Sequence, residues 1–162
     1  MKRLVCGLCV IVWLLETAAA QSTIFLVRHA EKGRENAADP GNPGLSDVGL
    51  TRAQSLRRIL KDAGITVVFA TEFKRTQETA AAVAKAAGIP LTVLPAKDTP
   101  ALIAKLKETR GRALVVGHSN TIPAVIKELG GGAEVTIEET AYDDLFVIIT
   151  GALPRLIHLH YP

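Results

Sequence analysis

The chain has 162 residues, of which 48% are hydrophobic and 22% are charged, as in one ordinary globular domain. This composition excludes a disordered or fibrous chain. The formal net charge of +3 is too small to indicate a protein that binds nucleic acid.

The N-terminal segment has the pattern of a secretory signal peptide. Two basic residues precede an apolar run over residues 4–15, and three alanines then precede Gln21. A transmembrane anchor is the alternative, but a span needs about 20 apolar residues, and Glu16 interrupts this run. We therefore expect cleavage after Ala20 and an exported protein, periplasmic or secreted, with no membrane segment after cleavage.

Removal of the predicted signal peptide, residues 1–20, would leave residues 21–162 as a single domain. It would take away two basic residues and one acidic residue, and so leave 17 basic and 15 acidic residues. Both cysteines, Cys6 and Cys9, lie in the segment expected to be removed. The mature domain would therefore have no disulfide, zinc–cysteine site or thiol chemistry.

Strand-like and helix-like segments alternate along the rest of the chain. Short apolar runs rich in β-formers predict strands, and apolar residues at helical spacing predict helices. Ser46 is a suitable cap for the first helix, and Gly64 ends it. The predicted strands cover residues 23–27, 66–70, 91–94, 113–116, 145–150 and 155–160, and the later predicted helices cover 72–87, 101–109 and 122–129.

This alternation predicts an α/β fold, a three-layer sandwich with a mostly parallel central sheet and helices on both faces. The last two strands predict a terminal hairpin that turns at Gly151-Ala152 and adds antiparallel edge strands. Sites in such sheets form at the carboxyl ends of strands. Polar clusters follow three of the strands: Arg28-His29, residues 71–75 and Gly117-His118-Ser119.

Two histidines and two arginines at these strand ends indicate a cationic pocket for a phosphate group. The guanidinium groups of Arg28 and Arg75 bind phosphoryl oxygens through a planar fork of donors. A neutral imidazole at His29 can attack phosphorus and hold the phosphoryl group covalently. The two arginines and His118 would neutralise the phosphoryl oxygens in the transition state. The backbone N–H of Ser119, at the start of a helix, would add an anion contact.

These segments resemble the motifs of the histidine phosphatase superfamily, which has the phosphoglycerate mutase-like fold. Residues 26–31, Leu-Val-Arg-His-Ala-Glu, resemble the first motif, where a strand ends in Arg-His-Gly. Residues 71–80 are similar to the second motif, where an arginine four residues after a Ser or Thr binds phosphate. Residues 115–120 resemble the third, which supplies the second catalytic histidine, and residues 45–50 fit the helix start between the first two.

The resemblance covers essentially the whole mature chain. The short chain resembles the compact branch of the superfamily, which includes small phosphohistidine-type phosphatases and small exported members. The resemblance implies a metal-independent phosphatase that needs no cofactor and hydrolyses a phosphomonoester or phosphoramidate through a phosphohistidine intermediate on His29. Its partner would be a small phosphorylated substrate. Arg28, Arg75, His118 and Ser119 would bind the phosphate.

The chain departs from the family pattern at the general acid. Many members carry a glutamate in a Leu-x-Glu stretch after the third strand, where this chain has Leu94-Pro95-Ala96-Lys97-Asp98. By position along the chain, Asp98 is the first candidate for the acid and Glu31 is the second. If neither serves, the enzyme would favour leaving groups that depart with little help, such as phosphoramidates or aryl phosphates.

Two other functions fit the same residues. A catalytically inactive module of the same fold would use the cationic pocket to bind phosphate or another anion. A metal-dependent hydrolase would instead use His29 and His118 with nearby carboxylates, and a metal-bound water as the nucleophile. Turnover of an aryl phosphate separates the first alternative from an enzyme, and activity in chelator excludes the second.

His158 and His160 alternate on a predicted strand and so share one face of it. Zinc sites need three or four ligands, and the sequence shows no third ligand beside these two. We interpret both as partly exposed strand residues and predict no metal site. The segment Tyr142-Asp143-Asp144 precedes a strand and is interpreted as a turn, with a place at the border of the pocket as the alternative.

Overall fold

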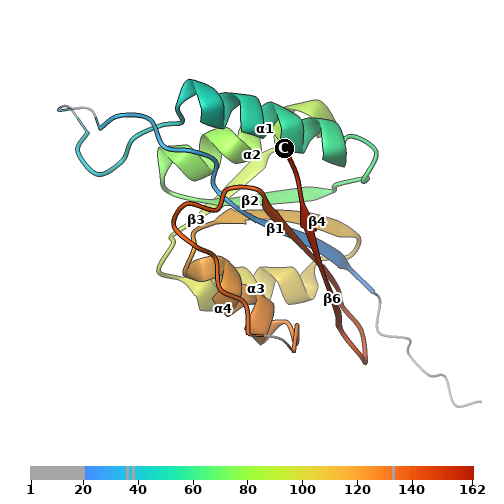
Figure 1. Cartoon of the computed structure of the whole chain (residues 1–162). Coiled ribbons are helices and arrows are strands. Elements are labelled where there is room, and N and C mark those ends of the chain that lie inside the picture. Colours follow the sequence, from blue (N-terminus) through green and yellow to red (C-terminus); the bar gives the residue numbers. More distant parts are fainter. Residues whose placement is uncertain (1–20, 36, 38, 133) are drawn as a thin grey trace, which may run out of the picture.

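The computed structural model describes residues 21–35, 37, 39–132 and 134–162 (Figure 1). The predicted signal peptide at residues 1–20 lies outside the described residues. Within the described ranges, no helix is long and apolar enough to cross a membrane.

Six strands and four helices alternate along the described residues, each within a few residues of its predicted position. The strands are β1 (Thr23–Arg28), β2 (Val67–Thr71), β3 (Leu91–Leu94), β4 (Arg112–Gly117), β5 (Asp144–Ile149) and β6 (Arg155–His160). The helices are α1 (Asp47–Leu60), α2 (Lys74–Ala87), α3 (Thr99–Glu108) and α4 (Thr121–Glu128).

The strands form one sheet in the order β3-β2-β4-β1-β5-β6. Strands β1 to β4 are parallel to one another, whereas β5 runs antiparallel to β1 and pairs with β6 as a hairpin. The predicted mostly parallel sheet with an antiparallel hairpin at its edge is therefore confirmed. Because β2, β4 and β1 are neighbours, the residues that follow their carboxyl ends lie side by side.

Helices cover both faces of the sheet, as Figure 1 shows for α1 and α2 on one side and α3 and α4 on the other. Alternate residues of β1 supply the two cores. Leu26 is buried in the cluster that contains Ile122 of α4, and Val27 is buried in the cluster that contains Leu56 of α1. A strand with apolar residues on both faces is typical of a central position in a parallel sheet. The three-layer α/β sandwich is confirmed.

The start of α1 is held tightly against the segment that follows β1. The hydroxyl of Ser46 accepts a hydrogen bond from the backbone N–H of Gly49 at 3.1 Å, which caps the helix as predicted. A Cβ atom on Gly49 would lie only 2.3 Å from the carbonyl oxygen of Glu31. Glycine therefore allows α1 to approach the backbone two residues beyond His29.

Candidate active site

The residues singled out in the sequence gather where β1, β2 and β4 end. Arg28, the last residue of β1, pairs with Gly117, the last residue of β4, so that His29 and His118 follow neighbouring strand ends. Arg75 lies in the first turn of α2, just beyond β2. They line an open cavity of about 620 Å³.

The charged groups around this cavity are mostly cations. Its lining includes the side chains of Arg28, Lys32, Arg75 and Lys97, against the single carboxylate of Glu139 among the described residues. Neither lysine was expected from the sequence. A cavity with this charge balance favours an anionic ligand.

His29 is buried in a form suited to nucleophilic attack. Its side chain is packed so that the residue is only 4% exposed, and Nδ1 lies 2.7 Å from the carbonyl oxygen of Ala30. A carbonyl oxygen only accepts, so Nδ1 carries the proton and Nε2 keeps its lone pair. Burial lowers the pKa of His29 to about 4, with the charges of Arg75 and Arg28 acting in the same direction, so the ring is neutral at neutral pH.

His118 packs edge-on against His29, with the ring centroids 5.4 Å apart. Its Nε2 lies 3.0 Å from Oγ1 of Thr71, and the ring of Phe73 supports it from another side at 5.2 Å. Burial, followed by the charge of Arg75, lowers the pKa of His118 to about 4. Both imidazoles are therefore neutral when no anion is bound.

A glycine lets the helix that follows β4 close on the backbone of His118. The N–H of His118 donates to Oγ1 of Thr121, the first residue of α4, at 2.8 Å. A Cβ atom on Gly117 would lie 2.7 Å from that same oxygen, closer than real Cβ contacts. The glycine before the histidine thus fixes the turn that directs the N-terminus of α4 toward the cavity.

Arg28 is held rigidly by the chain before β5. Its Nη1 donates to the carbonyl oxygens of Glu138 at 2.8 Å and Ala141 at 3.1 Å, and the residue is only 2% exposed. The guanidinium carbon lies 4.4 Å from the ring centroid of Tyr142. Tyr142 therefore borders the site, which was the alternative interpretation of its segment. Three contacts of this kind fix the direction of the guanidinium fork.

The two arginines that line the cavity have hydrogen-bond donors without partners. Arg75 stacks on Phe73, with 4.3 Å between its guanidinium carbon and the ring centroid. The Nε atoms of Arg75 and Arg28 are buried and have no hydrogen-bond partner among the described residues. Burial and the nearby charge of Arg28 lower the pKa of Arg75. An anion between the arginines would relieve this repulsion and satisfy their donors.

Glu139 is the acidic residue of the cavity lining, and like the two lysines it was not expected from the sequence. Its carboxylate accepts from Nη2 of Arg28 at 2.8 Å and from the hydroxyl of Ser119. The hydrogen bond from Ser119, followed by the charge of Arg28, lowers the pKa of Glu139. The side chain is 75% exposed, so an incoming anion can displace it from Arg28. The segment has no periodicity or motif from which this position could have been predicted.

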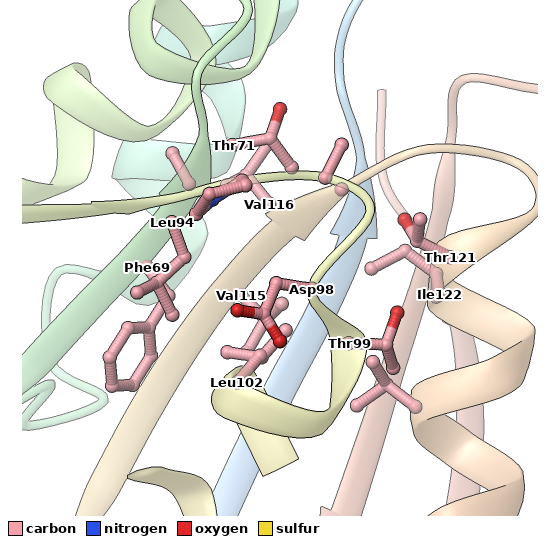
Figure 2. Close-up of a pocket in the computed structure, with 15 residues that line it drawn as sticks. Phe69, Thr71, Leu94, Asp98, Thr99, Leu102, Val115, Val116, Thr121 and Ile122 are labelled. Carbon is pink, nitrogen blue, oxygen red and sulfur yellow. The ribbon is translucent and has the colours of Figure 1, made fainter. Parts of the chain in front are cut away.

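The two carboxylates expected as general acids do not line the cavity. Asp98 caps α3, where it accepts from the N–H of Ala101 at 3.1 Å, and it lines a narrow apolar cavity next to the site (Figure 2). Glu31 pairs with Arg52 of α1 at 2.7 Å. Burial acts to raise the pKa of Glu31, but the hydrogen bonds and charge of Arg52 leave it below its ordinary value. Both carboxylates are bound by other groups in this structure, and their role as general acid stays a prediction.

Ser119 is the remaining residue expected to contact the anion. The residue lines the cavity two positions before α4 begins, and its hydroxyl is bonded to Glu139. The geometry brings Arg28, His29, Arg75 and His118 together with it, as the sequence predicted. Their roles in binding and catalysis stay predictions.

Comparisons with known proteins agree with this geometry. The sequence model of the histidine phosphatase superfamily (branch 1) matches residues 24–97, which include Arg28, His29 and Arg75. A search among curated proteins found no match.

Solved structures share the fold at low sequence identity. The protein histidine phosphatase SixA complexed with tungstate has a TM-score of 0.70 and 20% identity, over 85% of this chain and 96% of that chain. The mycobacterial glucosyl-3-phosphoglycerate phosphatase with inorganic phosphate has a TM-score of 0.65 and 14% identity, over 84% of this chain and 95% of that chain. Residues 24–97 thus match the sequence model of the histidine phosphatase superfamily, and most of the chain shares the fold of these solved phosphatases.

Proposed function

We propose that the protein is a metal-independent phosphatase that transfers a phosphoryl group to His29 and then to water. The observation that carries the proposal is the state of His29: a neutral imidazole with its proton on Nδ1, at a cavity lined by two arginines. The match of residues 24–97 to the superfamily model supports phosphatase activity. Two structural neighbours hold tungstate or inorganic phosphate, and both are tetrahedral oxyanions.

In the first step, Nε2 of His29 attacks phosphorus as the bond to the leaving group breaks and its electron pair departs with that group. Arg28 and Arg75 neutralise the negative charge on the phosphoryl oxygens. The anion also raises the proton affinity of the neighbouring His118, which then donates a hydrogen bond to it. In the second step, water attacks phosphorus, the P–N bond breaks and its electron pair returns to Nε2, while the protons of the water leave with the released phosphate.

The lining of the cavity sets the class of leaving group. Among the described residues, Glu139 is its one carboxylate, and its lowered pKa makes it a poor proton donor at neutral pH. An alkoxide is a poor leaving group without a proton donor, and general acid catalysis is worth about 10²–10⁴ in rate. We therefore assign the protein to phosphoramidates or aryl phosphates rather than to alkyl phosphates.

The test compares turnover of three substrates, a phosphoramidate, an aryl phosphate and an alkyl phosphate, in the presence of chelator. The alkyl phosphate is expected to have a kcat/KM at least about a hundredfold below the other two. His29→Asn should lower kcat/KM for every substrate at least about a thousandfold. Asp98→Asn and Glu31→Gln are matched controls, which should leave the ratio between substrates unchanged.

Three results would contradict parts of this proposal. Tight phosphate binding without turnover would indicate the inactive binding module. Loss of activity in chelator would indicate metal-bound water as the nucleophile. A selective loss of alkyl phosphate turnover in Asp98→Asn or Glu31→Gln would restore that residue as the general acid.

We also propose that the protein acts after export, with residues 1–20 as a cleaved signal peptide and residues 21–162 as the phosphatase domain. The support is the sequence pattern before Gln21. N-terminal sequencing of protein from the exported fraction tests this, with Gln21 expected as the first residue. A chain that still begins at Met1 and stays with the membrane would show an uncleaved anchor.

A further inference from the structure

A second cluster of imidazoles and carboxylates lies on the terminal hairpin, outside the lining of the cationic cavity. In the register of β5 with β6, Asp144 pairs with His160, and Phe146 pairs with His158. Residues at alternate positions of paired strands share one face, so all four side chains lie on the same face of the sheet. One ligand-type atom from each of Asp144, His158 and His160 lies within 4.8 Å of the other two.

The carboxylate of Asp144 is the fixed centre of this cluster. Its side chain is only 10% exposed, and Oδ1 lies 2.6 Å from Nε2 of His158 and 3.6 Å from Nδ1 of His160. The ring of His158 stacks on Phe146, with 4.3 Å between centroids, which holds the imidazole beside the carboxylate. Asp143 adds a second carboxylate, with Oδ2 3.3 Å from Nδ1 of His160.

We propose that Asp144, His158 and His160 bind a divalent transition-metal ion of the zinc type. Two imidazole nitrogens and one carboxylate oxygen are the three-ligand set of many zinc sites, with water or Asp143 as the fourth ligand. Ligands at about 2.0–2.1 Å from a tetrahedral ion lie about 3.3 Å apart. The two oxygen–nitrogen separations, 2.6 Å and 3.6 Å, lie on either side of this value, and both imidazoles, 46% and 61% exposed, have room to rotate.

The same donor set argues against calcium or magnesium. Both ions take six or more oxygen ligands, whereas this cluster offers nitrogen atoms and at most two carboxylates. A simple ion pair would also require only one imidazole at Asp144. Here a second imidazole, its ring centroid 4.7 Å from the first, approaches the same oxygen. A cation that accepts both nitrogens accounts for this convergence better than an ion pair does.

The test is a calorimetric titration of the full chain, free of any affinity tag, with ZnCl₂, and parallel titrations with CaCl₂ and MgCl₂. We expect one equivalent of Zn²⁺ to bind, and neither Ca²⁺ nor Mg²⁺ to compete with it. His158→Gln and His160→Gln should each weaken Zn²⁺ binding at least about tenfold. Cys6 and Cys9 are present in every variant, so any binding by these thiols is common to all titrations.

The matched control removes the other two histidines of the chain. His29→Asn/His118→Gln should bind Zn²⁺ as the unmodified protein does, even though it lacks phosphatase activity. Circular dichroism and thermal unfolding of the metal-free variants check that they are folded. Both variants at His158 and His160 change exposed positions on an edge strand, so the fold should persist.

Three results would overturn the proposal: no Zn²⁺ binding by the folded protein, unchanged affinity in His158→Gln/His160→Gln, or loss of binding only in His29→Asn/His118→Gln. The last result would place the ion in the cationic cavity instead. None of these outcomes depends on phosphatase activity, so the metal site and the proposed enzyme stand or fall separately.

Discussion

Burial of a neutral imidazole at His29 should make the stability of the protein depend on pH in a way that one substitution removes. The pKa of His29 falls from an ordinary value of 6.5 to about 4 in the folded protein. Above pH 6.5 the imidazole is neutral in both the folded and the unfolded chain. Between pH 6.5 and 4 the unfolded chain binds a proton that the folded protein does not, so the free energy of unfolding decreases as the pH falls.

The size of the effect follows from the shift. Each pKa unit corresponds to about 1.4 kcal/mol, so the loss attributable to His29 between pH 7 and 4.5 is about 2–3 kcal/mol. The variant His29→Asn has no titrating group at this position. The free energy of unfolding of the variant, minus that of the unmodified protein, should therefore increase by about this amount as the pH falls from 7 to 4.5.

Urea unfolding followed by circular dichroism at several pH values measures this difference. The single tryptophan, Trp13, lies in the predicted signal peptide and offers no probe of the folded domain. Leu153→Ala is the matched control because Leu153 is 88% exposed and carries no titrating group, so its effect should be independent of pH. If the difference for His29→Asn stays constant within about 0.5 kcal/mol, the imidazole is not held neutral by burial, and the argument for a ready nucleophile fails.

Two further predictions concern the residues around the nucleophile. Glu139→Gln should strengthen phosphate binding, up to about fivefold, because it removes an exposed carboxylate that competes for Arg28. Calorimetry with inorganic phosphate measures this affinity. Weaker binding by the variant would show that the carboxylate helps phosphate to bind. Gly49→Ala should lower the free energy of unfolding, measured in urea, by about 1–3 kcal/mol, because the added Cβ atom would overlap the carbonyl of Glu31. Leu50→Ala, at an exposed position, is the control and should lower it far less.

The elements and the main site residues were predictable because they depend on local patterns. Apolar runs of strand length and helical spacing fix the order of strands and helices, and that order predicts a parallel sheet. Arg28, His29 and His118 directly follow or end strands that become neighbours, and the carboxyl ends of parallel strands meet at one edge. Once the sheet was predicted, convergence of these side chains followed from geometry.

Residues that depend on contacts between distant segments were not predictable. Glu139 reaches Arg28 across 111 positions of the chain, from a segment without regular structure. Asp144 completes the histidine cluster from the opposite strand of a hairpin, 14 residues before His158. The sequence showed the two histidines on one face, but only the strand register shows which residue faces them.

Position along the chain did not show which groups the two candidate general acids contact. Asp98 follows β3 as the family glutamate does, but the following Thr99-Pro100 begins a helix, and an aspartate before such a start is a strong N-cap. The carboxylate of Asp98 therefore accepts a hydrogen bond from the backbone of α3. Glu31 likewise forms an ion pair with Arg52, which lies on a helix that only tertiary packing brings close. In both cases the carboxylate has a partner that its place in the sequence did not indicate.

The arrangement of the cavity lowers the stability of the protein and favours the binding of an anion. The Nε atoms of Arg28 and Arg75 are buried and have no partner among the described residues, which is unfavourable. Desolvation and mutual repulsion also oppose the charged forms of Arg75 and of both imidazoles. A bound phosphoryl group offsets these costs, because it accepts hydrogen bonds from the guanidinium groups and favours protonation of the second imidazole. The carboxylate of Glu139 offsets part of this cost at rest, but it is exposed and bears one charge, so a dianionic phosphate can replace it at Arg28. Binding energy is thereby concentrated on the phosphoryl oxygens, which also carry the charge in the transition state, rather than on the remainder of the substrate.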